Sequence, residues 1–410
     1  MPEHGRIRKM RYGAILVAAA TILGCATDPG GPGGIADQTD GRITITNDED
    51  RLSDRIIITD DDLSVGTGKG STVTAFSMKQ VAQLTPPTVQ GETLQATSIE
   101  LDGGFAYVSY MMRGDPAIGA IDVVQVKGVS NAVLRSSATF TDTDVIGLTI
   151  DGGNVYAAEA TSNPAYEFPA MVERISTSGS SKLDLSKNFR RMLSSYAATS
   201  VTTSNGFVYV TTGNTGGLYK IGQSDSLPVV QSVALDDARW VHTDGTTIVV
   251  AQGTPGRLAL FNAGTLAATG TITFDGAATP ESKSTVRLIG GKALVAAGEG
   301  GVKLIDLATG TVVGSIPRPT VAGLDPTVTV SNAVDGSGSY VFVSNGEAGI
   351  YVARASRALE ESSGQSAITL QSLGKLQFPA EQSVNHVAFD GSTLAVASGL
   401  GGVRFVTVTY

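Results

Sequence analysis

Short apolar runs separated by glycine-containing turns dominate the chain from residue 42 onward. The stretch 292–317 is a clear example, because three apolar runs, 293–297, 302–306 and 312–316, are separated by the turn sequences GEGG and ATG. Runs of this length between tight glycine turns predict antiparallel strands joined by hairpins.

The same unit recurs seven times after residue 96. Each copy has one strand, a turn of two or three small residues that is usually Asp-Gly or Gly-Gly, and a second strand, and most copies continue through another glycine turn into a third strand. Several of these strands carry apolar side chains on both faces, as expected when sheets pack face to face. A four-stranded unit of this length, repeated seven or eight times, is typical of a β-propeller.

The number of blades is less clear than the architecture. A weaker unit at 42–84 (segments 42–46, 55–59, 71–76 and 81–84) would make eight blades, with one strand missing from the last unit. We therefore predict an all-β fold, a β-propeller of four-stranded antiparallel blades, with eight blades preferred. In the alternative of seven blades, 42–46 would supply the missing strand of the last blade.

The amino terminus has the composition of an export signal. Four basic residues precede an uncharged run at 12–24, which is too short to span a bilayer but suits a signal peptide. The run ends in ILGC at 22–25, which resembles the bacterial lipobox. That resemblance implies cleavage before Cys25 and acylation of this residue, where several acyl chains would give stable anchoring. An ordinary signal peptide with an incidental cysteine is the alternative.

These features divide the chain into three parts. We expect a lipoprotein signal peptide at 1–24, a lipidated cysteine followed by a flexible Gly/Pro/Asp tether at 25–41, and a single propeller domain at 42–410. Ala26 follows the cysteine, which by resemblance to enterobacterial sorting implies the outer membrane. The expected location is therefore the bacterial cell envelope, with the membrane reached through the lipid anchor.

Three segments carry a known repeat pattern. The sequences GVKLID at 301–306, GIYV at 349–352 and GVRFV at 402–406 resemble the LVIVD-type and YVTN-type repeats of bacterial surface and periplasmic propellers. The resemblance covers most of 97–410 and implies the fold more than a function, because those families include adhesion-like proteins, some lactonases and proteins of unknown role. Trp240 is the only tryptophan, so the docking pattern of quinoprotein dehydrogenases is missing.

Charge and composition narrow the chemistry. The net charge is −9 and no basic stripe is present, so nucleic acid is not an expected partner. One cysteine and three histidines exclude an intramolecular disulfide and leave little scope for a histidine metal site. No cofactor is predicted. Asp60, Asp61 and Asp62 are weak Ca²⁺ candidates, but their spacing does not match an EF-hand, and a solvated acidic loop is the alternative.

Propeller geometry places the candidate binding residues. The start of strand one and the turn between strands two and three share a face, and that turn is long in the first three units, at 60–70, 111–117 and 161–169. These loops predict a binding rim, with ordinary variation in loop length as the alternative. Near the channel mouth, the starts of strand one supply the ligand-binding candidates Arg239, Trp240, Lys283, Asn385 and His386. The alternative is that these side chains only fill the channel and bond neighbouring backbone. A short helix is expected within 188–196.

No catalytic motif of the GxSxG, HExxH, CxxC or Walker type is present. We therefore expect a monomeric, non-enzymatic binding or interaction scaffold for a protein or glycan partner. The alternative is a lactonase-like hydrolase or lyase with its site at the channel mouth, because carboxylates that converge in three dimensions need no local motif.

The anchor is directly testable. Cys25→Ser removes the sulfur that would be acylated, so the variant should leave the membrane fraction and appear in the soluble envelope fraction. Fractionation followed by immunoblotting measures this, and continued membrane association of the variant would refute lipidation at Cys25.

Overall fold

The computed structural model describes residues 36–65, 76–128, 130–178, 181–280, 282–362, 366–379 and 382–410. The predicted signal peptide, Cys25 and most of the predicted tether lie outside these residues. The chain separates into the units Met1–Gly34 and Ile35–Tyr410, and all of these residues belong to the second. No helix within the described part is long and apolar enough to cross a membrane.

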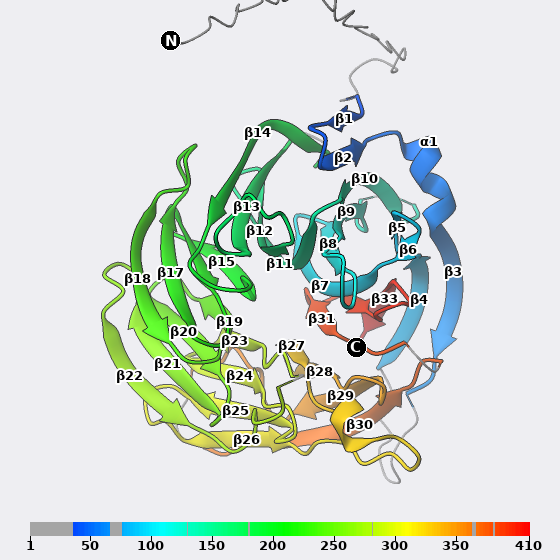
Figure 1. The fold of residues 1–410 in the computed structure, drawn as a ribbon. Coiled ribbons are helices and arrows are strands. Elements are labelled where there is room, and N and C mark those ends of the chain that lie inside the picture. Colours follow the sequence, from blue (N-terminus) through cyan, green and yellow to red (C-terminus); the bar gives the residue numbers. More distant parts are fainter. Residues whose placement is uncertain are drawn as a thin grey trace, which may run out of the picture. The chain divides into compact units, whose positions relative to one another are not determined.

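Seven antiparallel sheets are arranged in a ring and form a seven-bladed propeller (Figure 1). Blades 1 to 3 contain, in order, β7 (Gln95–Asp102), β8 (Phe105–Met111), β9 (Gly119–Gln125) and β10 (Val133–Phe140); β11 (Thr143–Asp151), β12 (Asn154–Thr161), β13 (Ala170–Thr177) and β14 (Leu183–Met192); and β15 (Ser200–Ser204), β16 (Phe207–Thr211), β17 (Gly216–Gly222) and β18 (Val229–Leu235).

Blades 4 to 6 repeat the same meander. They contain β19 (Ala238–Thr243), β20 (Thr247–Gln252), β21 (Arg257–Asn262) and β22 (Ala268–Thr273); β23 (Val286–Ile289), β24 (Lys292–Ala296), β25 (Val302–Asp306) and β26 (Val312–Ile316); and β27 (Ala333–Ser337), β28 (Tyr340–Ser344), β29 (Ile350–Ala355) and β30 (Leu370–Leu376). In every blade the first strand lies innermost.

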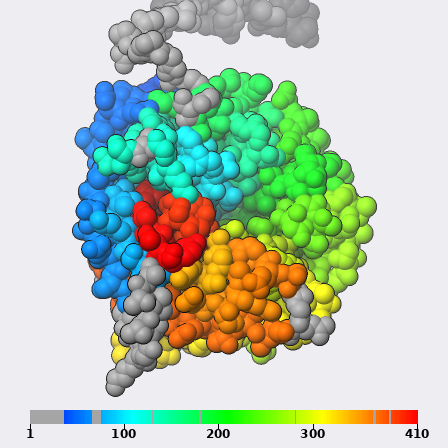
Figure 2. Space-filling model, turned by 180° about the vertical axis from the view of Figure 1, so that it is seen from behind, coloured from blue at the N-terminus to red at the C-terminus, as the bar shows by residue number. Residues whose placement is uncertain are grey.

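Blade 7 joins the two ends of the propeller. Its inner strands come from the carboxyl end, β31 (His386–Phe389), β32 (Thr393–Ala397) and β33 (Val403–Thr409), and its fourth strand is β4 (Ser77–Leu84). β33 pairs antiparallel with β4, with Val403 opposite Leu84 and Thr409 opposite Ser77. Figure 2 shows the carboxyl-terminal segment packed beside the amino-terminal strands. The ring is therefore closed by backbone hydrogen bonds between distant parts of the chain.

The preferred count of eight blades was wrong, and the ring has seven. The strand that completes blade 7 is β4, not 42–46 as the seven-blade alternative expected. Segment 42–46 instead forms β2 (Ile43–Thr46), which extends blade 1 beside β10, with β1 (Gln38–Thr39) beyond it. β3 (Ile56–Leu63) extends blade 7 beside β4. The segments predicted to form an extra blade thus lie in the outer strands of blades 1 and 7.

Two other predictions are corrected. Asp60, Asp61 and Asp62 lie in the outer strand β3 and not in a loop. Residues 188–192 belong to β14, whose pairing with β13 excludes the predicted helix there. The remaining elements are short: α1 (Glu49–Leu52), the 3₁₀ turns Ser53–Arg55 and Pro326–Val328, and the hairpin β5 (Thr88–Val89) with β6 (Glu92–Thr93).

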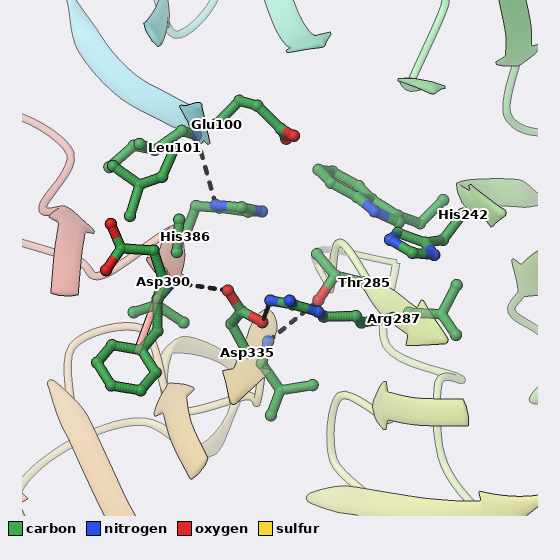
Figure 3. A pocket seen from close by; sticks show the side chains of 15 residues that line it. Glu100, Leu101, His242, Thr285, Arg287, Asp335, His386 and Asp390 are labelled. Atoms are coloured by element: carbon green, nitrogen blue, oxygen red, sulfur yellow. Dashed lines mark hydrogen bonds and ion pairs between the residues drawn. The ribbon is translucent and has the colours of Figure 1, made fainter. Parts of the chain in front are cut away.

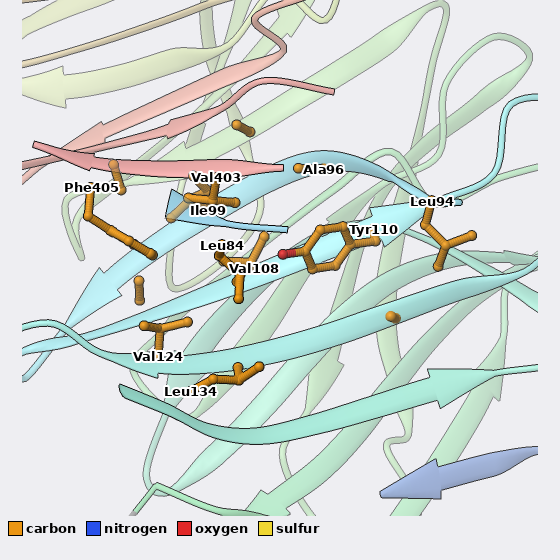
Figure 4. Packing of buried hydrophobic residues seen from close by; sticks show 14 of the residues in the cluster. Leu84, Leu94, Ala96, Ile99, Val108, Tyr110, Val124, Leu134, Val403 and Phe405 are labelled. Carbon is orange, nitrogen blue, oxygen red and sulfur yellow. The ribbon is translucent and has the colours of Figure 1, made fainter. Parts of the chain in front are cut away.

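The core consists of the apolar layers between neighbouring blades. Every residue of β24 and β28 is buried, which confirms that the inner strands pack on both faces. Figure 4 shows the layer at the closure, where Leu84, Val403 and Phe405 of blade 7 pack against Ile99 and Val108 of blade 1. Closing the ring therefore buries apolar side chains of both blades.

The last glycine of the turn between strands two and three is held closely by the outer strand. A Cβ added at Gly301, Gly349 or Gly402 would come within 2.2, 2.1 or 2.0 Å of a backbone oxygen of the fourth strand of its blade. All three also have positive φ, from 73° to 82°. Glycine is required here by close approach and by backbone conformation together, which explains why it recurs at this position.

Gly402→Ala should therefore destabilise the ring closure. The new methyl group meets the Leu84 carbonyl in a conformation unfavourable for alanine, so we expect a loss of about 3 kcal/mol in urea unfolding. Gly391→Ala is the matched control, because it also has positive φ but no neighbour closer than 3.8 Å, and should cost only about 1 kcal/mol. Equal losses would contradict the close-packing explanation.

Candidate functional site

A cavity of about 240 Å³ lies in the central channel. Its walls come from the first strands of blades 1, 4, 5, 6 and 7 (Figure 3). It extends from Trp240 and His386 along these strands to Asp390, which begins the Asp-Gly turn of blade 7. The cavity therefore extends away from the face that carries the long loops.

Polar side chains reach this cavity because the inner strands have a free edge. Each first strand pairs with only one strand of its own sheet, so its other edge faces the channel with unpaired N–H groups. A side chain from the preceding blade accepts one such N–H in five places: Val241 to Ser200, Leu288 to His242, Val334 to Thr285, Phe389 to Asp335 and Ile99 to His386. These bonds fix the orientation of both channel histidines.

The bonds also determine which nitrogen of each imidazole carries hydrogen. Nδ1 of His386 accepts from the Ile99 N–H at 3.4 Å, and Nδ1 of His242 accepts from the Leu288 N–H at 3.3 Å. A backbone N–H can only donate, so in both neutral rings the hydrogen is on Nε2. Burial lowers the pKa of His242 to about 4 and that of His386 to about 3, so both rings are neutral near pH 7.

Trp240 and His386 form an aromatic pair in the wall of the cavity. Their ring centroids are 5.3 Å apart with an interplanar angle of 28°, and they come from blades 4 and 7. The pair presents a flat surface, and because Trp240 is the only tryptophan, it also serves as an intrinsic fluorescent reporter of the cavity.

Two carboxyl groups in the cavity have different roles. Asp335 forms an ion pair with Arg287 and accepts the backbone N–H groups of Gly336 and Phe389 at 2.8 and 2.7 Å. Burial raises the pKa of Asp335 in spite of Arg287. Both of its oxygens are engaged in holding blades together. Sequence pattern places Asp335 in a turn, but it lies within β27.

Glu100 has no hydrogen-bond partner among the described residues. Loss of hydration inside the channel raises the pKa of this carboxyl to about 7, and the neighbouring Asp335 raises it further while Arg287 opposes the shift. The side chain lines the cavity and remains accessible to water, which moderates the desolvation. Glu100 is therefore the cavity carboxyl that is free to respond to a ligand.

The sequence candidates have separate positions. Trp240 and His386 line the cavity as described. Arg239 instead pairs with Asp237 at 2.6 Å and donates to two backbone carbonyls of the loop before blade 5. Lys283 crosses the channel from blade 5 to donate to the Thr97 carbonyl of blade 1, and Asn385 donates to the Ala96 carbonyl at 2.9 Å. Arg239, Lys283 and Asn385 thus connect separate blades.

The other predicted candidates show no shared site. Asp60 pairs with Lys79 at 2.6 Å on the exposed surface of β3 and β4. Within the described ranges, no group of three His, Cys, Asp or Glu side chains could hold a metal ion. Sequence reasoning missed Glu100, His242 and Arg287, although each is a polar residue directly after an apolar one inside a first strand, and this was the available signal.

A separate buried charge cluster supports one of the long loops. Glu159 and Glu173 of blade 2 are fully buried with Arg190, and Arg42 reaches Glu173 from the start of β2. Burial and the nearby Glu173 raise the pKa of Glu159 well above its ordinary value. Arg190 also lies 5.6 Å from the ring centroid of Tyr166 in loop 161–169. The cluster holds that loop and β2 against blade 2.

Comparisons with known proteins add little beyond the fold. No family model matches the chain, and no curated protein matches it. Among solved structures, the computationally designed Ika8 protein is similar, with 11% identity, a TM-score of 0.47, and coverage of 78% of this chain and 98% of that chain. The resemblance to LVIVD-type and YVTN-type proteins is confirmed only as far as the propeller fold.

Glu100 should make stability depend on pH. Its pKa is raised from 4.5 to about 7, so between these values the folded state keeps a proton that the unfolded state has released, and stability falls as pH rises. Glu100→Gln removes this titration. The stability of the variant relative to the parent should therefore be higher at pH 8 than at pH 5. Urea unfolding at both pH values measures this, with the exposed Glu92→Gln as control. A pH-independent difference would contradict it.

Proposed function

We propose that this protein is a cell-envelope lipoprotein whose propeller acts as a binding scaffold for a glycan partner. Cys25 supplies the anchor, and the channel cavity receives one sugar ring of the glycan. The observation that carries the proposal is the arrangement of the Trp240–His386 pair beside free polar groups in one cavity.

The chemistry of the cavity suits a sugar ring. At about 240 Å³, it is smaller than the roughly 300–1,000 Å³ that hold drug-sized ligands, so a single ring is the appropriate size. A pyranose has an apolar C–H face, which can stack on an aromatic surface, and hydroxyl groups around its edge. The two histidines, Arg287 and Glu100 surround the aromatic pair with groups that can bond hydroxyls.

A hydrolase is the second candidate, because Glu100 and Asp335 line the same cavity. Paired carboxylates of this kind serve as acid and base or nucleophile in hydrolysis. However, Asp335 already accepts two backbone N–H groups and pairs with Arg287, so it has little capacity left to accept a proton from water. Non-enzymatic binding is therefore the better-supported proposal.

Trp240 fluorescence tests this function. Titration of the purified domain with soluble mono- and disaccharides, neutral, acidic and basic, should give a saturable emission change with at least one sugar and no turnover of that sugar. His386→Ala removes the stacked ring and a donor, and should weaken binding about tenfold or more.

Tyr196→Ala is the matched control, because this side chain is exposed and lies outside the cavity. It should bind like the parent. No saturable change with any sugar would contradict the glycan proposal, and hydrolysis of the bound sugar or of a lactone would favour the enzyme instead.

A further inference from the structure

We infer that the cavity selects an acidic sugar, one that carries a carboxylate group, over neutral or basic sugars. The inference rests on the proposed function, since it specifies the class of glycan that the same cavity would take. It follows from the balance of hydrogen-bond donors and acceptors around the cavity.

Donors outnumber free acceptors among the side chains that line the cavity. Nε2 of His242, Nε2 of His386 and Nε1 of Trp240 each carry a hydrogen, and no acceptor within the described residues bonds any of them. Arg287 adds N–H groups beyond those that reach Asp335. Carboxylate oxygens accept several hydrogen bonds at once, so they match this arrangement better than an ammonium group does.

The fold fixes the two imidazole donors in place before any ligand arrives. If either ring moved its hydrogen to Nδ1, the Ile99 or Leu288 N–H would lose its acceptor at the buried inner edge of a blade. An unsatisfied buried N–H is costly, so the tautomer is held by the backbone. Donors that need no rearrangement bind an anion at lower entropic cost.

Most charged groups around the cavity are already paired, so the paired charges favour neither an anion nor a cation. Arg287 and Asp335 neutralise each other across blades 5 and 6, and Asp390 pairs with Lys127 at 2.7 Å. Both histidines are neutral near pH 7. Among the carboxyl groups that line the cavity, Glu100 is thus the one without an ion-pair partner in the described chain. A cation bound beside Glu100 would also contact four side chains that present N–H donors.

Glu100 makes the selection dependent on pH. Its carboxyl is affected by Asp102 on its own strand, by Asp335 on β27 and by Arg287 on β23, while the neutral rings of His386 and His242 line the same cavity from β31 and β19. When protonated, Glu100 can donate to a carboxylate. When ionised, it repels one. Binding of an acidic sugar should therefore weaken as pH rises above neutrality and should be accompanied by proton uptake.

The experiment compares glucuronate, glucose and glucosamine, which differ in charge but share a ring size. Trp240 fluorescence of the full chain is titrated with each sugar at pH 6 and pH 8. We expect glucuronate to bind at least about tenfold more tightly than the other two at pH 6, and to lose about tenfold at pH 8. Glu100→Gln should abolish that loss, and the exposed Glu92→Gln should retain it.

A second measurement does not depend on any variant. Calorimetric titration of glucuronate near pH 7, in buffers of different ionisation enthalpy, should show net proton uptake on binding. His242→Gln offers a further check, because an amide can accept the Leu288 N–H and donate to the ligand at the same time, whereas His242→Leu can do neither. The Gln variant should bind glucuronate better than the Leu variant.

The possible failures are distinguishable. Equal binding of glucose and glucuronate, tighter binding of glucosamine, or absence of proton uptake would overturn the acidic-sugar inference and leave a glycan-binding scaffold in place. If none of the three sugars, and none of the wider panel, changes Trp240 emission saturably, the proposed function itself is overturned together with this inference.

Discussion

The free inner edge of each blade is the constraint on which the rest of the structure depends. A propeller places one unpaired strand edge of every sheet at the channel, where backbone N–H groups need acceptors. Here the acceptors are side chains of the preceding blade, including hydroxyl, carboxylate and imidazole groups. Satisfying the scaffold therefore requires polar residues in the channel, and the chemistry of the cavity is a direct result of that requirement.

The acceptors differ in what they leave for a ligand. Asp335 is fully used, since backbone and Arg287 occupy both oxygens. An imidazole is different, because it has two nitrogens on opposite sides of the ring. His242 and His386 each use one nitrogen for the neighbouring blade and direct the other to the cavity. A histidine at this position can therefore stabilise the ring of blades and contact a ligand at the same time.

The repeat and its glycine turns were predictable from sequence because they depend on local rules. Gly301 and Gly402 occupy equivalent turns with the same close contact, and the pattern around them recurs along the chain. The blade count was not predictable in this way. β4 pairs with a strand more than 300 residues away, and β3, with three consecutive aspartates, has the weak pattern of an outer strand that is largely exposed.

The candidate site was predictable in part, for a similar reason. Trp240 and His386 stand out as large polar residues at the starts of strands, and both line the cavity. Arg239 has the same appearance in sequence, yet its guanidinium is held by Asp237 and by backbone carbonyls of the next blade. Glu100 and Arg287 lie inside strands that pattern reading assigns to the core. Only the ring geometry shows that the inner edge of these strands faces a cavity.

The closure of blade 7 has a consequence for how the chain folds. β4 is made early in synthesis, but the strands it joins, β31 to β33, are made only after blades 1 to 6. Blades 1 to 6 can assemble from neighbouring segments, whereas the final pairing must bring the two ends of a long chain together. Until then, β4 and the apolar faces of blades 1 and 6 remain uncovered and open to misassociation. Completion of the ring is thus the folding step that depends most on intact strands β31 to β33.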